Sequence, residues 1–327
     1  MVLSIEFNRF RFHFILLTVA LMTGLLLVGC LPGEPKNNDA EEPENGIERQ
    51  VNYPVTITDD AGREVVIEEI PERLVSFAPS NTEILFALDV GSSVVGVDDF
   101  SIWPEGKLQG LVRIGGPESP DYEVISELEP DIVFCVEGMD EIAQQLDDMG
   151  LTSIILKADD FSDVYANVAL IGNVVNKKDK AEAVVDYMKE ETNKLENKVT
   201  EIPENEKPRV FVEIWPSDPI ITAGKGTLVH QVIESAGGIN AAGEHDVNWP
   251  SVSVEELVEL EPDVLILQFK DSYQSLKSSD RPEWNQIPAV QNERYYLVSP
   301  GILNHPSPRL VEGIKTVAEI LHPELFE

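Results

Sequence analysis

One segment of the chain occurs twice, and this internal repeat constrains the fold more than any other feature of the sequence. Residues 122–135 read YEVISELEPDIVFC, and residues 254–267, each 132 positions later, read VEELVELEPDVLIL. Each copy has the pattern of a short amphipathic helix, a Glu-Pro-Asp turn and a buried strand, because proline lacks an N–H and ends a helix. Solenoid repeats have shorter periods and occur many times. The sequence therefore predicts two lobes of one architecture.

Strands and helices alternate in the first half of the chain. Residues 55–59 and 65–67 lie on either side of Gly62 and predict a β-hairpin. Apolar strands are predicted at 74–77 and 94–97, and polar residues at 79–83 followed by the apolar run 84–88 predict a helix between them. This alternation indicates an α/β fold, in which each lobe has a mostly parallel central sheet.

A long helical stretch separates the two lobes. Apolar residues recur at helical spacing from about residue 161 to 199, and residues 176–179 are a candidate kink or break. One long helix acts as a stiff strut, so we expect limited opening and closing. The predicted boundaries are an N-terminal lobe at 53–158, a linking helix at 159–200 and a C-terminal lobe at 201–327.

The N-terminus predicts export. Arg9 and Arg11 precede an apolar run at 14–28, which is shorter than the roughly 20 residues of a membrane-spanning helix and fits a signal peptide over residues 1–29. The run ends in Val28-Gly29-Cys30, which resembles the lipobox of bacterial lipoproteins and implies cleavage before Cys30 and a lipid on its thiol. An uncleaved anchor is the alternative. Residues 30–52 are rich in Pro, Asn and acids and predict a disordered tether to the outer face of the cell membrane.

Charge and motif content argue against several classes of protein. With 59 acidic and 24 basic residues, the formal charge of −35 disfavours binding to nucleic acid and to anionic membranes. The sequence has no G-x-S-x-G, H-E-x-x-H or C-x-x-C motif, so an α/β enzyme is a distant alternative. Cys135 lies in a predicted buried strand, and the histidines after Cys30 do not have zinc-ligand spacing. We therefore expect no catalytic residues, no resident metal and no cofactor.

The order of these features, together with the segment PERLVSFAPSNTE at 71–83, resembles the helical-backbone (class III) substrate-binding proteins of ABC importers for cobalamin, haem and iron–siderophores. The resemblance covers residues 53–327 and is closest to the cobalamin-binding branch, on the segments VGVDDFSIWP at 95–104, NWPSVSVE at 248–255 and PSPR at 306–309. It implies a monomeric, extracytoplasmic lipoprotein that delivers a small ligand to a permease dimer with its ATPase subunits.

The resemblance also implies a ligand cleft between the lobes, at the strand-end loops where open α/β sheets bind their ligands. A corrinoid is large, flat and edged with amides, so aromatic faces suit it better than a cluster of charges. The candidate contacts are Phe100, Trp103, Trp215, Ile221 and Trp249. Core packing is the alternative for each tryptophan. Trp284 is expected to be structural.

Two acids of the repeat have a further implied role. In the family, acids at the positions of Glu123 and Glu255 dock onto arginines of the permease, and two similar lobes present such carboxylates at matching points. The alternative is that each glutamate only stabilises its own helix N-terminus.

Other ligands of the same fold remain open. A ferric siderophore is the second candidate, because it calls for cationic residues such as Arg113 and Arg309. Haem is the third, with Tyr or His ligands such as His245 or His305. Residues 114–118, IGGPE, lack the aromatic residue that cobalamin binders of the family tend to have there.

Overall fold

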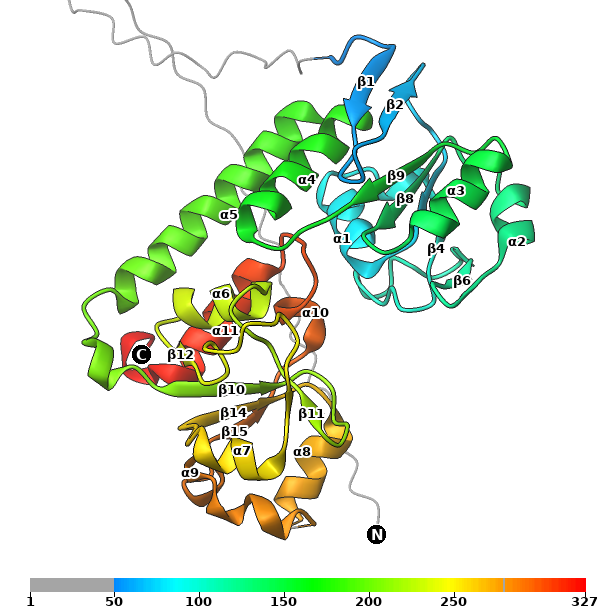
Figure 1. The fold of residues 1–327 in the computed structure, drawn as a ribbon. Coiled ribbons are helices and arrows are strands. Elements are labelled where there is room, and N and C mark those ends of the chain that lie inside the picture. The colour runs from blue at the N-terminus through cyan, green and yellow to red at the C-terminus, as the bar shows by residue number, and fades with distance from the viewer. Residues whose placement is uncertain (1–49, 279) are drawn as a thin grey trace, which may run out of the picture. The chain divides into compact units, whose positions relative to one another are not determined.

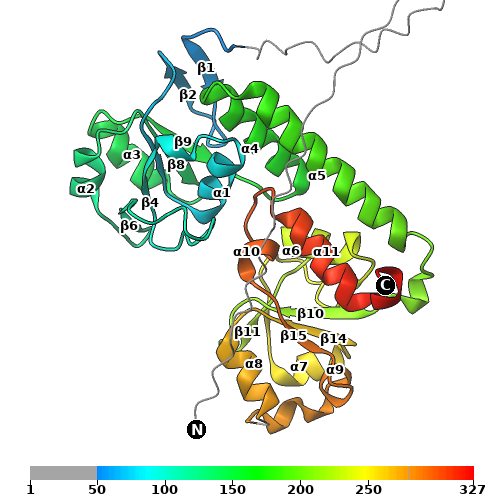
Figure 2. The same cartoon turned by 180° about the vertical axis from the view of Figure 1, so that it is seen from behind.

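The computed structural model describes residues 50–278 and 280–327, which form two α/β halves, each built around its own parallel sheet (Figures 1 and 2). The predicted fold class is therefore confirmed. The predicted signal peptide, Cys30 and residues 30–49 of the predicted tether lie outside the described residues. In the described ranges, no helix combines the length and the apolar character needed to cross a membrane.

The N-terminal lobe contains a five-stranded sheet in the order β5-β4-β3-β8-β9, and all neighbouring strands are parallel. Helices cover both faces of this sheet (Figure 1), which is why β8 is buried along almost its whole length. Its strands are β3 (Leu74–Ser76), β4 (Val94–Val97), β5 (Val112–Arg113), β8 (Ile132–Val136) and β9 (Ser153–Leu156), and its helices are α1 (Pro79–Ala87), α2 (Tyr122–Glu127) and α3 (Asp140–Asp148). Two antiparallel hairpins complete the lobe, β1 (Val55–Thr58) with β2 (Glu64–Ile67) and β6 (Gly115–Gly116) with β7 (Ser119–Pro120).

The C-terminal lobe repeats this topology. Its four-stranded parallel sheet has the order β12-β10-β14-β15, which matches β4-β3-β8-β9 strand for strand. Its strands are β10 (Arg209–Glu213), β12 (Ile239–Asn240), β14 (Val264–Leu267) and β15 (Tyr295–Leu297), with β11 (Ile220–Ile221) and β13 (Ser251–Val252) paired apart from them. Its helices are α6 (Leu228–Ser235), α7 (Val254–Glu259), α8 (Lys270–Lys277), α9 (Pro288–Gln291), α10 (Pro300–Leu303) and α11 (Leu310–Leu321). The prediction of two similar lobes is confirmed.

The repeated segments agree in their details. The side chains of Asp121 and Ser253 cap α2 and α7 by accepting the N–H of the third helical residue. Both helices end before a glutamate with a left-handed backbone, Glu129 with φ 42° and Glu261 with φ 46°. Each then enters a buried strand across a proline. The turn chemistry read from the sequence therefore builds the same unit twice.

An arginine and an aspartate fasten each unit to its sheet. The Arg73 Nε–H donates to the Leu128 carbonyl at 2.8 Å, and the Arg209 Nε–H donates to the Leu260 carbonyl at 3.1 Å. The aspartates of the two turns, Asp131 and Asp263, accept the backbone N–H of these arginines. Each arginine thus satisfies a carbonyl that the helix end leaves free.

The predicted helical stretch between the lobes is divided at the break that the sequence indicated. Helix α4 (Phe161–Val174) turns at Asn176, which has a φ of 55°, into helix α5 (Lys178–Val199). The two helices are antiparallel. A Cβ on Gly172 would collide with Ala181, and the Lys189 ammonium lies 5.1 Å from the centre of the Tyr165 ring. The predicted linking range of 159–200 thus contains two helices, of which α5 is the longer.

Helix α5 belongs to the cores of both lobes. Near its start, Ala181 and Val185 pack with N-terminal residues of the core that includes Leu74 and Phe134. Near its end, Leu195 packs in the core of the C-terminal lobe. One continuous helix is thereby buried at both ends against different sheets.

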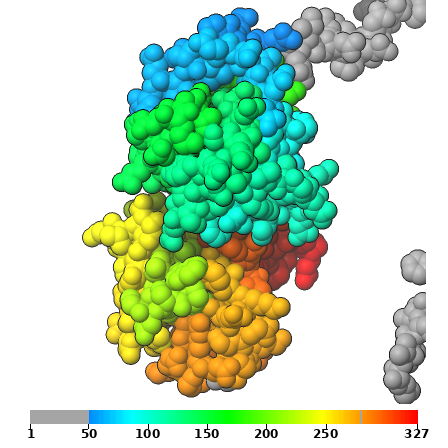
Figure 3. Space-filling model, turned by 90° about the vertical axis from the view of Figure 1, so that its right-hand side faces the viewer, coloured from blue at the N-terminus to red at the C-terminus, as the bar shows by residue number. Residues whose placement is uncertain are grey.

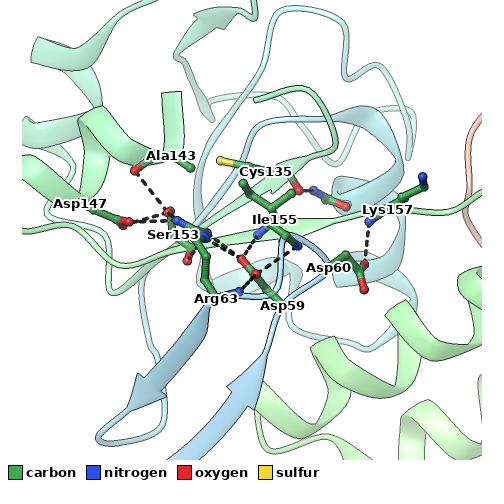
Figure 4. Close-up of polar contacts among 11 residues, drawn as sticks. Asp59, Asp60, Arg63, Cys135, Ala143, Asp147, Ser153, Ile155 and Lys157 are labelled. Carbon is green, nitrogen blue, oxygen red and sulfur yellow. Dashed lines mark hydrogen bonds and ion pairs between the residues drawn. The ribbon is translucent and has the colours of Figure 1, made fainter. Parts of the chain in front are cut away.

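The β1–β2 hairpin is braced against the edge of the first sheet by a buried carboxylate (Figure 4). Asp59 accepts hydrogen bonds from the Arg63 Nε and Nη2 groups at 2.9 and 2.7 Å, and from the Ile155 N–H at 3.1 Å. Burial alone would raise the pKa of Asp59, but the hydrogen bonds from Arg63 and Ile155 outweigh burial and hold the pKa below its ordinary value of 3.8. Contact with the lobe already begins at Val51, whose N–H donates to Asn176, two residues before the predicted start of the fold.

Replacing Asp59 with asparagine is expected to destabilise the protein by about 2 kcal/mol near neutral pH, because the amide presents donors to the donors of Arg63 and Ile155. The stabilisation from the ionised carboxylate is present above pH 3.8 and is lost as the pH falls through the lowered pKa, so the difference from the wild type should shrink there. Urea unfolding at several pH values measures both. Asp60→Asn is the matched control, since the exposed Asp60 side chain accepts one backbone N–H among the described residues, that of Lys157, and asparagine retains an acceptor. An equal loss in both variants would contradict the bracing role.

Candidate ligand cleft and docking surface

The loops at the carboxyl ends of the two sheets meet between the lobes. One cavity of about 650 Å³ is lined in the N-terminal lobe by residues of α1, by residues of the segment 89–92 that follows it and by Trp103, Pro104 and Lys107, and in the C-terminal lobe by Pro308 and Arg309. Of the candidate ligand contacts, Trp103 lines this cavity. A smaller cavity of about 90 Å³ lies between Ala158 and Asp159 of the first lobe and Trp249 and Asn304 of the second. Figure 3 shows one face of this boundary, with the first lobe in blue to green above the second in yellow to red.

The candidate contacts of the N-terminal lobe lie on the loop after β4. Phe100 is 63% exposed and Trp103 is 37% exposed, with the exposed Ile102 between them. The Phe100 ring lies over Gly116, where an added Cβ would come within 2.9 Å of the ring. The absence of a side chain at Gly116 therefore leaves room for the Phe100 ring.

A buried network of hydroxyl groups holds this loop in place. The Thr82 hydroxyl lies 2.7 Å from the Ser76 hydroxyl and 2.8 Å from the Ser101 hydroxyl, and Ser101 donates to Asp98. Burial raises the pKa of Asp98, although hydrogen bonds from Ser101 and the Phe100 N–H oppose the rise. The aromatic side chains are therefore exposed while the backbone that carries them is fixed.

The C-terminal lobe has two exposed tryptophans on adjacent loops. Trp215 is 56% exposed and rests edge-on against Phe269, with ring centres 5.0 Å apart. Its backbone pairs with that of half-buried Ile221 in a β-bridge. Trp249 is 52% exposed and immediately precedes β13, which pairs with the strand that contains Ile221. The pairing of β11 and β13 thus brings Trp215 and Trp249 to the same side of this lobe.

The loop that contains Trp249 packs closely against two glycines. A Cβ on Gly224 would overlap the Val247 carbonyl oxygen, and a Cβ on Gly226 would overlap the Asn248 side-chain amide. The Gly224 N–H donates to the Asn248 carbonyl at 2.8 Å. The segment at 224–227 is therefore a glycine-rich turn, and α6 begins directly after it.

The structure thus brings Phe100 and Trp103 together on one lobe and Trp215, Ile221 and Trp249 together on the other. Core packing, the alternative for the three tryptophans, does not apply, since each is more than one-third exposed. Trp284 is 2% exposed and carries the Arg281 guanidinium 4.6 Å above its ring, so its structural interpretation is confirmed.

The arginines and histidines that could bind a siderophore or haem already contact other residues of the protein. Arg113 donates to the carbonyls of Asp98 and Ser101, and Arg309 lies against Trp103 and Glu83. His305 Nδ1 lies 3.1 Å from a Glu83 oxygen, and His245 lies 3.5 Å from Glu256. Among the described residues, no group of three or more His, Cys, Asp and Glu side chains is arranged to hold a metal ion. Cys135 is fully buried in β8, and burial raises the pKa of its thiol to about 12.

Glu123 and Glu255 are the second residues of α2 and α7, at equivalent positions of the repeated unit. Both side chains are exposed. Within the described part of the chain, neither carboxylate has a hydrogen bond or an ion pair to another side chain. Both are therefore available to an external partner.

Sequence reasoning missed two residues that organise the cleft, Glu83 and Asp98. Both are buried acids. A polar residue at the end of an apolar strand, as Asp98 is, was a signal that could have marked one of them. Glu83 gave no such signal, because its partners lie more than 220 positions away.

Residues 74–300 match the family described as periplasmic binding proteins. The chain belongs to this family. Its members are substrate-binding transport proteins that work outside the cytoplasm, which is not a class of enzyme, and the resemblance found in the sequence is thereby confirmed.

Individual relatives span most of the chain. An uncharacterized ABC transporter substrate-binding lipoprotein of Bacillus subtilis (strain 168), YvrC, is 31% identical over 313 residues, covering 94% of this chain and 96% of the relative. A cobalamin-binding protein of Halobacterium salinarum is 26% identical over 326 residues, covering 96% of this chain and 85% of the relative. Among solved structures, the periplasmic heme-binding protein RhuT of Roseiflexus sp. RS-1 superimposes with a TM-score of 0.68 at 25% identity, covering 78% of this chain and all of that one.

Gly224→Ala is expected to lower the free energy of unfolding by about 1–3 kcal/mol and to increase the solvent exposure of Trp249, because the methyl group displaces the backbone at Val247. Thermal unfolding and acrylamide quenching of tryptophan fluorescence measure the two effects. Gly226→Ala should be milder, because the side chain of Asn248 can rotate away from the new methyl group. If Gly226→Ala were the more damaging variant, this account of the turn would be wrong.

Proposed function

We propose that this protein captures a corrinoid of the cobalamin type outside the cell and delivers it to the permease of an ABC importer. The observation that carries the proposal is the set of exposed aromatic side chains on loops at the strand ends of both lobes, Phe100, Trp103, Trp215 and Trp249. Exposed aromatic faces are costly in water and are typical of binding surfaces. They suit a flat ligand with apolar faces and amide edges.

Charge within the cleft also favours a corrinoid over an anionic siderophore. Arg113 is engaged with two backbone carbonyls, and Arg309 with the buried Glu83. A ferric siderophore would have to compete for these cations. A siderophore nevertheless remains the second candidate, and haem the third, since RhuT shares the fold and binds haem.

The remaining parts of the proposal concern the place of action and the partner. A lipid on Cys30 would hold the protein at the membrane through its anchor only, in keeping with the description of YvrC as a lipoprotein. Glu123 and Glu255 would dock onto basic pockets of a permease dimer, which works with its ATPase subunits. Because charge-assisted pairs fix register and speed encounter, two matched carboxylates suit a two-fold symmetric partner. We expect a monomer that binds its cargo without converting it and holds no separate cofactor.

Calorimetry of the purified protein should give a dissociation constant for cyanocobalamin in the micromolar range or below, which corresponds to at least about 8 kcal/mol of binding free energy. Trp249→Ala should weaken binding by about tenfold, because a central aromatic contact is lost. Tyr187→Ala is the matched control, since Tyr187 is equally exposed but lies on α5.

Haem and a panel of ferric siderophores are titrated in the same way. Saturation by one of these, with no heat from cyanocobalamin, would overturn the corrinoid assignment and leave the family unaffected.

Combining Glu123→Ala with Glu255→Ala should leave cyanocobalamin affinity unchanged and reduce uptake by the cognate transporter at least about tenfold, because both docking carboxylates are removed. Uptake is measured with labelled cyanocobalamin in cells that depend on the variant protein. Glu127→Ala with Glu259→Ala is the matched control, since these exposed acids lie on the same two helices at repeat-equivalent positions. Normal uptake by the first double variant would show that Glu123 and Glu255 stabilise only their own helices.

A further inference from the structure

A buried carboxylate of the first lobe is bound by three residues of the second. Glu83 lies on α1, with a side chain 3% exposed. One of its oxygens is 3.1 Å from His305 Nδ1 and 3.3 Å from an Arg309 Nη atom, and the other accepts a short hydrogen bond from the Ser307 hydroxyl. All three partners come from residues 305–309, which join α10 to α11 and are called the crossing segment below.

The crossing segment is also fixed to its own lobe. The amides of Asn304 and Gln268 exchange two hydrogen bonds, at 2.7 and 2.8 Å, directly before the segment begins. Gln268 is buried at the end of β14, and α11 begins immediately after the segment. Residues 305–309 are therefore held to the second sheet on one side and to α1 on the other.

Arg309 makes a second contact across the lobes. Its guanidinium carbon lies 4.1 Å from the centre of the Trp103 ring, which is cation–π distance. Among the described residues, no other charged or aromatic group stacks on this ring. The exposed Trp103 thus rests on a cation from the opposite lobe, and the buried Glu83 fixes that cation.

We propose that Glu83 and Arg309 are positioning residues for the ligand cleft: Glu83 holds the Arg309 guanidinium, and Arg309 holds Trp103 as one wall of the cleft. The part that concerns cargo rests on the proposed function, because Trp103 is a proposed ligand contact. The chain of contacts itself does not depend on any ligand.

The physical argument is that the planar guanidinium can satisfy both neighbours at once. Its edge N–H groups point to a carboxylate and its face covers an aromatic ring. A guanidinium without its buried acceptor turns toward solvent, because an exposed cation is better hydrated than one held beside unpaired groups. Glu312, the other carboxylate near Arg309, is exposed and 3.4 Å away, so it holds the side chain less firmly.

The test uses the full chain without ligand. It contains four tryptophans, so Trp215→Phe with Trp249→Phe leaves Trp103 as the exposed one and Trp284 as a buried internal reference. Acrylamide quenching then measures how accessible the Trp103 ring is to solvent, and thus whether Arg309 lies over it. In this background Glu83→Gln should raise the quenching constant of the exposed tryptophan at least about twofold, since a neutral amide replaces the charged acceptor that holds Arg309. Glu312→Gln is the matched control and should change nothing.

Unchanged quenching in Glu83→Gln would overturn the proposal. If Glu83→Gln fails to fold, as unprotected Trp284 would reveal, Arg309→Lys decides instead. Lysine keeps the positive charge near Glu83 but lacks the flat face, so it should also expose Trp103, and unchanged quenching there would again overturn the proposal.

A double-mutant cycle with cyanocobalamin tests the link to cargo in the protein that retains all other tryptophans. If Glu83 acts through Trp103, Glu83→Gln weakens binding in the wild type and has little further effect in Trp103→Ala. Independent, additive losses would overturn the positioning role. If cyanocobalamin does not bind at all, the corrinoid proposal fails while the quenching result still stands.

Discussion

The burial of α5 in two separate cores is the constraint on which the arrangement of the lobes depends. Ala181 packs against the first sheet and Leu195 against the second, on one continuous helix of 22 residues, which at 1.5 Å per residue is about 33 Å long. Protein cores are packed as densely as organic crystals and resist displacement even by the size of a methyl group. Neither lobe can therefore slide along α5 without opening a cavity in its own core. The remaining freedom is a swing of one lobe about the helix.

The crossing segment limits that swing at a second place. A swing that separates α1 from residues 305–309 would break the contacts of Glu83 with His305, Ser307 and Arg309. Two connections at different points, one apolar and one polar, make a stiffer clamp than either alone. Such a clamp changes its cleft through the side chains and loops that line it more readily than through rotation of whole lobes.

Sequence patterns predicted the parts of this protein that are local or duplicated. The repeat gave the two lobes and the matching positions of Glu123 and Glu255. The break near residue 176 was recognisable from the sequence, but the left-handed backbone of Asn176, which folds α4 back along α5, was not. The Glu83 cluster joins positions 222 to 226 residues apart, and no periodicity or motif in a single sequence encodes such a pairing.

The duplicated and the unduplicated parts of the molecule differ in a way that matches the two kinds of partner proposed for it. The α2 and α7 units share their caps, their exposed glutamate, their left-handed residue and their arginine–aspartate fastening. The loops that carry the candidate ligand contacts share none of this. In the first lobe hydroxyl groups around Thr82 support the loop, whereas in the second lobe the loop packs against Gly224. A partner with two-fold symmetry requires the same surface twice, whereas a single asymmetric cargo requires two different walls. Similarity retained at the helix tips and lost at the cleft is what selection for both tasks on one duplicated scaffold would produce.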